Sequence, residues 1–472
     1  MTRRSTVALL LGCLLLAQPG CARYRPEPLD PAAHAGRYRA RSLSDSALLA
    51  WVERHAGAPA DGRWTDRQLG AAALAYRADL ERARRQWLAA RASAAAAGAR
   101  PGPGVEGEVE RRVGGRREGS PWVVSLAGLF TFELGGKRGA RLQAARARET
   151  AAEAELALLV AATLGRVRGA ALALRHAEET RAGAAAELQA LGRVETLERA
   201  RYAEAALGSG EVARTAAEVV GAAAAAASAE TEVLLARSAL AGALAVPDGE
   251  LDAVGVATTV QGGCAWGEGI GPDSLAALAL RRRGEIARAL AAYAGAEADL
   301  RSRIAATYPD LELGPGFIWD QGVHRWTLAA ALPALLNLRH RGPIDAAEAA
   351  RHAAAAGVSE VQDELFAETG KALAHCRGAV RERAAVDSQR VAAERVAALA
   401  REAYGRGEAG TLQLARAELL LRSAEARERA ARQRLERAGL ELELTAAEWR
   451  GAETVRWPDL RSEPFIPREE HR

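Results

Sequence analysis

Two short stretches of this chain alternate apolar and polar residues, as strands with two different faces do. In residues 310–336, an outgoing strand is followed by a turn at 320–322 and a strand returning from Arg325 to Leu335. Pro333 near the end of the returning strand argues against a central strand of a soluble sheet. The outgoing strand places four large apolar residues on one face and four other residues on the opposite face: Leu311, Leu313, Phe317 and Trp319 against Glu312, Gly314, Gly316 and Ile318. The pattern predicts a β-hairpin, and by itself a surface hairpin on a helical protein fits equally well.

A second hairpin is predicted over residues 104–134. Its first strand alternates small or apolar residues with glutamates, Val105, Gly107 and Val109 against Glu106, Glu108 and Glu110. The chain then turns at 114–117 and returns from Trp122 to Leu134.

Most of the remaining sequence has a helical pattern. Long helices are predicted over 139–206 and 345–403, and shorter ones over 65–98 and 212–245. At ~1.5 Å per residue the longest is about 100 Å, which no compact core spans. Exposed faces carry Glu/Arg pairs such as Glu425 with Arg429 and Glu428 with Arg432, typical of helices in water.

The sequence is also duplicated. Leu74 and Trp87 recur as Leu280 and Tyr293, and the turn at 207–210 recurs at 404–407, about 200 residues later. Each half therefore runs helix, hairpin, long helix, glycine turn, helix. We divide the chain into a first repeat (65–245), a glycine-rich connector (246–273), a second repeat (274–450) and a tail (451–472).

The start of the chain is typical of an exported protein. Arg3 and Arg4 precede the apolar run 7–17, so residues 1–20 are interpreted as a signal peptide. Cys21 follows Gly20 and precedes a proline-spaced stretch, which favours a lipid-acylated cysteine at the head of an extended, anchored segment, 21–64. The match to a lipobox is imperfect because Gln18 stands where an apolar residue is usual, so ordinary cleavage nearby is the alternative.

Composition narrows the class of protein. The chain of 472 residues is 49% hydrophobic but only 4% aromatic. Because much of the apolar fraction is alanine, slim, closely packed helices are favoured over a thick core. The net charge of +4 falls to about +2 without Arg3 and Arg4, which gives no reason to expect nucleic acid as a partner. Cys264 and Cys376 remain in the exported chain, and an exported protein could pair them, but their neighbourhoods suggest no disulfide framework.

No catalytic or cofactor chemistry is indicated. Gly135-Gly136-Lys137-Arg138 departs from a phosphate-binding loop, since Thr131 stands where a glycine is needed and Arg138 follows the lysine. The histidines lack partners at metal-ligand spacing. No nucleophile, base and acid can be assigned. We expect neither an enzyme, nor a cofactor, nor a bound metal.

The second hairpin carries a resemblance to a known family. The segments that carry it are Tyr308-Pro309-Asp310-Leu311, Gly314-Pro315-Gly316, Trp319 to Trp326, and Arg341-Gly342-Pro343-Ile344. They resemble the second barrel hairpin of the outer-membrane efflux channels, the trimeric exit ducts of Gram-negative tripartite pumps. The likeness is closest to members that serve heavy-metal-type resistance-nodulation-division (RND) transporters. One departure lies at Leu332 to Leu338, where the family has an apolar-proline run ending in Phe-Asn.

The resemblance implies a mostly α fold with a small β part. Long helices would form an α-helical barrel in the periplasm, and four strands per protomer would join in a 12-stranded β-barrel in the outer membrane. Four strands alone would leave edge amides without partners in lipid, and closure needs at least eight strands, so a homotrimer follows. The aromatic residues expected on the membrane hairpins are Trp122, Phe130, Phe132, Phe317, Trp319 and Trp326.

The glycine turns acquire a role from the same resemblance. Gly208, Gly210, Gly405 and Gly407 would form the periplasmic tip that meets the adaptor protein. Gln413 and Arg416 occupy the places where the family has acidic residues around the closed aperture. Our hypothesis is that Arg416 holds the closed tip by pairing between chains with an acid such as Glu418 or Glu408, and disfavours cations. The alternative is that Arg416 points into the helix wall or the outer solvent.

The resulting prediction is a passive outer-membrane channel that works with a periplasmic adaptor and an inner-membrane RND transporter. Its cargo would be small toxic compounds or metal ions. Two alternatives remain: a periplasmic helical scaffold lipoprotein without a pore, and a type I secretion duct for polypeptides.

Overall fold

The computed structural model describes residues 24–60, 62–111, 113–114, 120–252, 254–257, 263–267, 269–320, 322–332 and 341–446. Cys21, the signal peptide and the tail after 446 lie outside these residues. The chain forms two compact units that divide after Arg41. In the first, helix α2 (Pro31–Arg39) begins at Asp30, whose side chain accepts a hydrogen bond from the backbone of Ala32. All further elements belong to the second unit.

The segment 21–64, expected to be extended, contains two helices where it is described. After α2, helix α3 (Ser46–Ala56) is capped by the Asp45 side chain and buries Leu48, Trp51 and Val52. The short strand β1 (Arg63–Thr65) then leads into α4 (Asp66–Tyr76). The prolines that favoured an extended segment end at Pro31, the first residue of α2, and the apolar residues of α3 follow them.

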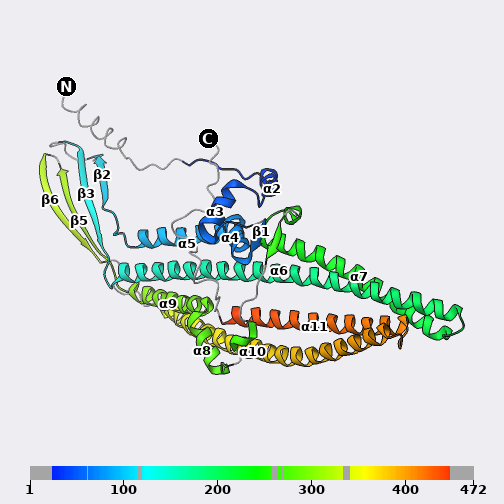
Figure 1. The fold of residues 1–472 in the computed structure, drawn as a ribbon. Helices are drawn as coiled ribbons and strands as arrows, with labels where there is room; N and C mark the ends of the chain where they lie inside the picture. Colours follow the sequence, from blue (N-terminus) through cyan, green and yellow to red (C-terminus); the bar gives the residue numbers. More distant parts are fainter. Residues whose placement is uncertain are drawn as a thin grey trace. The chain divides into compact units, whose positions relative to one another are not determined.

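Two long helical hairpins dominate the second unit. Helix α6 (Lys137–Ala203, 67 residues) is followed by α7 (Ser209–Leu244), and α10 (Arg341–Gly405, 65 residues) by α11 (Thr411–Thr445). The members of each pair run side by side, and their connecting turns lie at the same end (Figure 1). Helices α6 and α7 are also long and apolar enough by composition to cross a membrane.

The helix predicted over 65–98 is two helices, α4 and α5 (Ala78–Ala97), broken at Arg77. The second repeat has the same break, at Arg283 between α8 (Pro272–Arg282) and α9 (Gly284–Ala305). The residue with an extended backbone at each break is an arginine, not a glycine or proline, so the sequence pattern does not reveal the break.

The two breaks have matching contacts. Arg77 donates two hydrogen bonds to Asp79, at 3.0 and 2.5 Å, and one to the carbonyl of Ala243 at the end of α7. Arg283 does the same with Glu285, at 3.0 and 2.7 Å, and with the carbonyl of Thr445 at the end of α11. Arg77 and Arg283 have nearly equal backbone angles (φ −76°, ψ 119° and φ −73°, ψ 126°). The duplication therefore extends to individual hydrogen bonds.

The connector between the repeats contains short elements. These are η1 (Asp248–Leu251), β4 (Gly255–Ala257) and η2 (Gly263–Gly267), and β4 pairs in parallel with β1. Cys264 of η2 and Cys376 of α10 form a disulfide, a pairing that their sequence neighbourhoods did not indicate.

A separate four-stranded antiparallel sheet is built from both hairpins. Its strands are β2 (Gly104–Arg111), β3 (Trp122–Phe132), β5 (Leu311–Asp320) and β6 (Val323–Ala331), in the order β2-β3-β5-β6. The two hairpins are joined along β3 and β5, where Leu126 lies opposite Phe317. The sheet extends from the end of the helical body opposite the helix turns (Figure 1). The predicted fold class, mostly helical with a small β part, is confirmed for the chain.

Candidate functional site

The sheet has one apolar face and one polar face. Strand register places Val124 opposite Trp319, Leu126 opposite Phe317, and Phe317 opposite Trp326, all on one face. All six aromatic residues singled out from the sequence share it: Trp122, Phe130, Phe132, Phe317, Trp319 and Trp326. Trp326 is 84% exposed and Leu328 73% exposed. A face this apolar and this exposed is unusual for a protein in water.

The opposite face carries the acidic residues of the four strands, together with smaller apolar residues such as Val123 and Ala127. Glu106, Glu108 and Glu110 of β2 lie opposite Ala127, Ser125 and Val123. Glu312 and Asp320 of β5 share this face, and Asp320 accepts a 2.6 Å hydrogen bond from Arg325. The alternation between lipid-compatible and water-compatible faces is the arrangement found in strands that separate lipid from an aqueous lumen.

Both outer strands of the sheet have only one neighbour among the described residues. Strand β2 pairs with β3 alone, and β6 pairs with β5 alone. Each edge therefore presents a row of backbone N–H and C=O groups that a further strand could satisfy.

A basic turn fixes the base of the hairpins to the helices. Lys137 forms a 2.8 Å ion pair with Asp310 at the start of the second hairpin. Arg138 and Arg141 donate to the carbonyls of Gly98 (2.6 Å) and Ala97 (3.0 Å) at the end of α5. Gly135 has φ +68°, and a Cβ there would lie 2.5 Å from the Tyr308 ring, so only glycine fits. This segment is a structural junction.

The two helix turns share one hydrogen-bonding motif. After α6, the Ala206 N–H bonds to the carbonyl of Arg201 and the Ala205 N–H to that of Tyr202. After α10, the Glu408 N–H bonds to Ala403 and the Gly407 N–H to Tyr404 in the same way. This is the Schellman motif, which needs one residue with positive φ.

Only one of the four predicted turn glycines supplies that conformation. Gly407 has φ +76°, whereas the corresponding residue of the first turn is Ala205, with φ 54°, and not Gly210, with which the sequence comparison paired Gly407. Gly208 is extended and precedes α7, Gly210 lies within α7, and Gly405 is the last residue of α10.

Arg416, which follows the second turn, contacts acidic residues on both sides of the first turn. Its guanidinium lies 2.7 Å from Glu198 of α6 and 3.6 Å from Glu211 of α7. Glu198 is only 1% exposed, whereas the Arg416 side chain is 42% exposed. The two acids named from the sequence have other neighbours: Glu418 lies 3.5 Å from Arg401, and Glu408 3.1 Å from Arg406. Gln413 is exposed near the start of α11.

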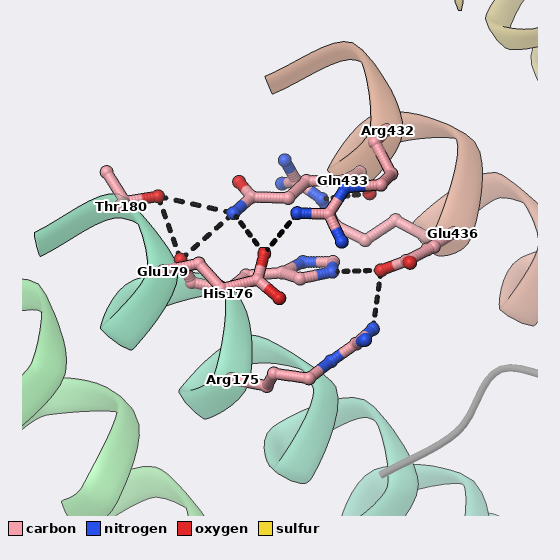
Figure 2. Close-up of polar contacts among 8 residues, drawn as sticks. Arg175, His176, Glu179, Thr180, Arg432, Gln433 and Glu436 are labelled. Atoms are coloured by element: carbon pink, nitrogen blue, oxygen red, sulfur yellow. Dashed lines mark hydrogen bonds and ion pairs between the residues drawn. The ribbon is translucent and has the colours of Figure 1, made fainter. Parts of the chain in front are cut away.

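The contact of Arg416 is one end of a polar seam between α6 and α11. Further along the seam, Glu436 of α11 lies 2.5 Å from Arg175 and 2.6 Å from the Nε2 atom of His176 (Figure 2). Gln433 donates to the carbonyl of His176 at 3.0 Å. Burial lowers the pKa of His176, although the hydrogen bond and charge of Glu436 oppose this.

The expected pairs within α11 are replaced by pairs across the seam and along the helix. Arg432 pairs with Glu179 of α6 at 2.9 Å, as Figure 2 shows. Glu428 pairs with Arg383 of α10, and Glu425 with Arg422. Sequence patterns cannot identify such partners because they depend on how α6, α10 and α11 are rotated against one another.

A buried charge cluster lies at the other end of the seam. Arg168 of α6 lies 2.7 Å from Glu443 of α11 and 3.6 Å from Asp66 of α4. Burial raises the pKa of Asp66 to about 6, despite the opposing charge of Arg168. This cluster joins the first-repeat helices to the last helix of the second repeat.

No group of three or more His, Cys, Asp or Glu residues in the described part of the chain could hold a metal ion. An open pocket of about 590 Å³ lies among α6, α10 and α11, with Leu172, Leu440 and Leu444 in its lining. Among its charged lining residues, Arg283 pairs with Glu368, and Glu441 pairs with His375 outside the lining.

No protein-family model and no curated protein matches the sequence. Solved structures do match the fold. One is the outer membrane protein VceC from Vibrio cholerae, with a TM-score of 0.64 and 19% identity over 81% of this chain and 95% of that one. The Campylobacter jejuni CmeC outer membrane channel matches with a TM-score of 0.63 and 14% identity over 95% and 96%. The open state of the Neisseria gonorrhoeae MtrE outer membrane channel matches with a TM-score of 0.61 and 21% identity over 80% and 88%. This chain therefore has the fold of these outer-membrane channels.

Proposed function

We propose that this chain is the outer-membrane channel component of a tripartite efflux system. Three copies would form a β-barrel of twelve strands in the outer membrane and a helical barrel in the periplasm. The channel would be passive and not an enzyme, with energy supplied by an RND transporter of the inner membrane. Its cargo would be small toxic compounds or metal ions.

The observation that carries this proposal is the two-faced sheet with two open edges. An apolar, aromatic face suits lipid, and the acidic face suits a water-filled lumen. A sheet of four strands cannot cross lipid unless its edge amides are satisfied. Pairing of β6 in one copy with β2 in the next would satisfy both edges and close a barrel. A scaffold lipoprotein without a pore would have no use for the exposed aromatic face.

The helical part supports the same function. Helices of 67 and 65 residues are about 100 Å long at ~1.5 Å per residue, long enough for a duct that extends well away from the sheet. Their turns lie at the end remote from the sheet (Figure 1). We propose that the turns meet a periplasmic adaptor, and that Cys21 carries a lipid anchor in the outer membrane.

Two neighbouring residues of β6 give a matched test. Leu328 lies on the apolar face and Thr327 on the polar face, and both side chains are exposed. A charge facing lipid costs roughly 2–4 kcal/mol near the bilayer midplane for Arg or Lys, and less for Glu, whereas a lumen position tolerates it. Leu328→Glu should therefore impair membrane insertion, and Thr327→Glu should not.

The wild type and both variants are compared by outer-membrane fractionation, by the mass of the complex in detergent, and by conductance in planar bilayers. We expect a conducting trimer for the wild type and for Thr327→Glu, and a large loss of inserted protein for Leu328→Glu. A stable wild-type monomer without conductance, or equal insertion of both variants, would contradict the channel proposal.

A further inference from the structure

The disulfide lies between the connector and the second repeat. Cys264 of η2 is 3% exposed and Cys376 of α10 is 1% exposed, and their Cα atoms are 5.3 Å apart. The closed loop contains most of the second repeat, including its hairpin, since the two cysteines are 112 residues apart. The bond therefore restrains a segment that no other covalent link holds in the described residues.

The connector also contacts α11 closely at this point. A Cβ on Gly439 of α11 would lie 2.6 Å from the Cα atom of Gly263. Around the disulfide, the buried cluster includes Leu275 of α8, Leu373 of α10 and Leu442 of α11. Thus η2 lies against α10 and α11 together, and the disulfide is at the centre of the contact.

The first repeat builds the corresponding contact without a disulfide. Ala205 and Gly407 are equivalent turn residues, and the same spacing makes Leu174 of α6 the counterpart of Cys376. Leu174 packs in a buried cluster with Leu48, Trp51 and Val52 of α3. The second-repeat cluster has no aromatic residue among its buried members and consists of alanines, leucines and the two cysteines. The disulfide therefore stands where the first repeat uses large apolar side chains.

We propose that the Cys264–Cys376 disulfide is a strap, closed after export, that holds the connector on α10 and α11 and so fixes the middle of α10 against the C-terminal end of α11. The timing rests on the proposed periplasmic location, because thiols stay reduced in the cytosol. Cys376 lies about 29 residues, or ~43 Å along the helix, from the end of α10 at the turn. Opening the strap would loosen the second repeat and leave the first repeat unchanged.

Closure follows thiol–disulfide exchange with a disulfide-bearing oxidoreductase of the exporting compartment. The thiolate of one cysteine attacks the oxidant's disulfide and releases one of its sulfurs as a thiolate. The thiolate of the other cysteine then attacks the mixed disulfide and releases the second sulfur. The chain loses two electrons and two protons, and the oxidant becomes a dithiol.

The bond itself is tested by differential thiol labelling of full-length protein from membranes. Free thiols are first blocked with N-ethylmaleimide under denaturing conditions without reductant. After reduction, we expect maleimide-polyethylene glycol to add to two cysteines in the wild type and to none in Cys264→Ser/Cys376→Ser. Absence of the double adduct in the wild type would overturn the proposal.

The restraint is tested by hydrogen exchange of the purified protein with and without reductant. We expect reduction to cause loss of exchange protection in residues 263–267, 372–379 and 435–442, with no change in the first-repeat residues 164–174 and 233–244. The double serine variant should show this loss without reductant and should not respond to it.

A second variant, Cys264→Ala/Cys376→Leu, lacks the bond and has at position 376 the leucine that the first repeat has at the equivalent position, Leu174. Loss of protection in residues 263–267 is expected here too. Full wild-type protection in this variant, or in the reduced wild type, would show that packing alone holds the connector and would overturn the strap. Neither labelling nor exchange depends on conductance, so a protein that passes both but forms no channel would contradict the proposed function alone.

Discussion

At the scale of single residues, the most informative position is Ala205. It occupies the left-handed conformation that Gly407 occupies in the second turn, with φ 54° against φ +76°. An L-residue with a side chain pays roughly 1–2 kcal/mol for this conformation, whereas glycine does not. Exchanging alanine and glycine at positions 205 and 407 therefore measures the cost of this conformation.

We expect Ala205→Gly to stabilise the first helical hairpin by about 1 kcal/mol and Gly407→Ala to destabilise the second by about as much. Local unfolding free energies from hydrogen exchange near residues 198–212 and 400–414 would measure both. Gly210→Ala is the control, since Gly210 is helical and a Cβ there meets no atom within 4 Å. Stabilisation by both Ala205→Gly and Gly407→Ala would contradict the assignment of the motif.

At the scale of elements, α6 and α11 are joined near their turns by Arg416 and Glu198. Because Glu198 is almost completely buried, removal of Arg416 leaves a carboxylate without its cation, at a cost on the order of 2 kcal/mol. Arg416→Ala should therefore loosen the turn end of α6 and α11, seen as faster hydrogen exchange at residues 194–203. Arg422→Ala is the control, since Arg422 pairs with Glu425 of its own helix, three residues away, and so its loss leaves the contact between α6 and α11 in place.

In the channel proposal, Arg416→Ala should also raise the conductance of the closed channel, because it weakens the contact between the two repeats at the turns. Arg416→Asp should in addition raise the preference for cations, measured as a reversal potential across a salt gradient. Unchanged selectivity in a trimer that still conducts would mean that Arg416 does not face the pore, as the alternative interpretation of the sequence holds.

Sequence patterns predicted the helices and strands better than they predicted the contacts between them. The alternation over residues 104–134 and 310–336 predicted two hairpins, and the register places their aromatic residues on one face. The break at Arg77 was missed because it is held by the distant Ala243 carbonyl, with no glycine or proline at the broken position. The partner of Arg416 was missed for a similar reason: Glu198 is 218 residues away, and its approach depends on the rotation of α6 against α11. The disulfide was missed because its two cysteines lie in unlike elements.

At the scale of the whole molecule, the cluster of Asp66, Arg168 and Glu443 links folding to pH. Asp66 has a pKa of about 6 in the folded chain, against 3.8 for an ordinary exposed aspartate. Between about pH 4 and pH 6, the folded state therefore binds more protons than the unfolded state. Stability from this group falls as pH rises through that window, by on the order of 2–3 kcal/mol in total.

Asp66→Asn should remove this fall, so that its stability relative to the wild type increases from pH 4 to pH 6.5. Thermal unfolding of the detergent-solubilised protein over this range measures the difference. His176 contributes in the opposite direction, because its lowered pKa favours the folded state as pH rises toward 6.5. That contribution is common to both proteins and cancels in the comparison. A difference that does not change with pH would contradict the raised pKa.

The open edges of the sheet have a further consequence for biogenesis. A newly exported chain carries two unsatisfied strand edges, β2 and β6, next to an exposed aromatic surface, and such edges pair readily with any available strand. Pairing of β6 with β2 of another copy is head-to-tail, so it gives a closed ring only if the curvature is right and otherwise an open-ended chain of subunits. Assembly is thus a competition between ring closure and aggregation. High expression, which raises the frequency of encounters away from the membrane, should shift that competition toward aggregates.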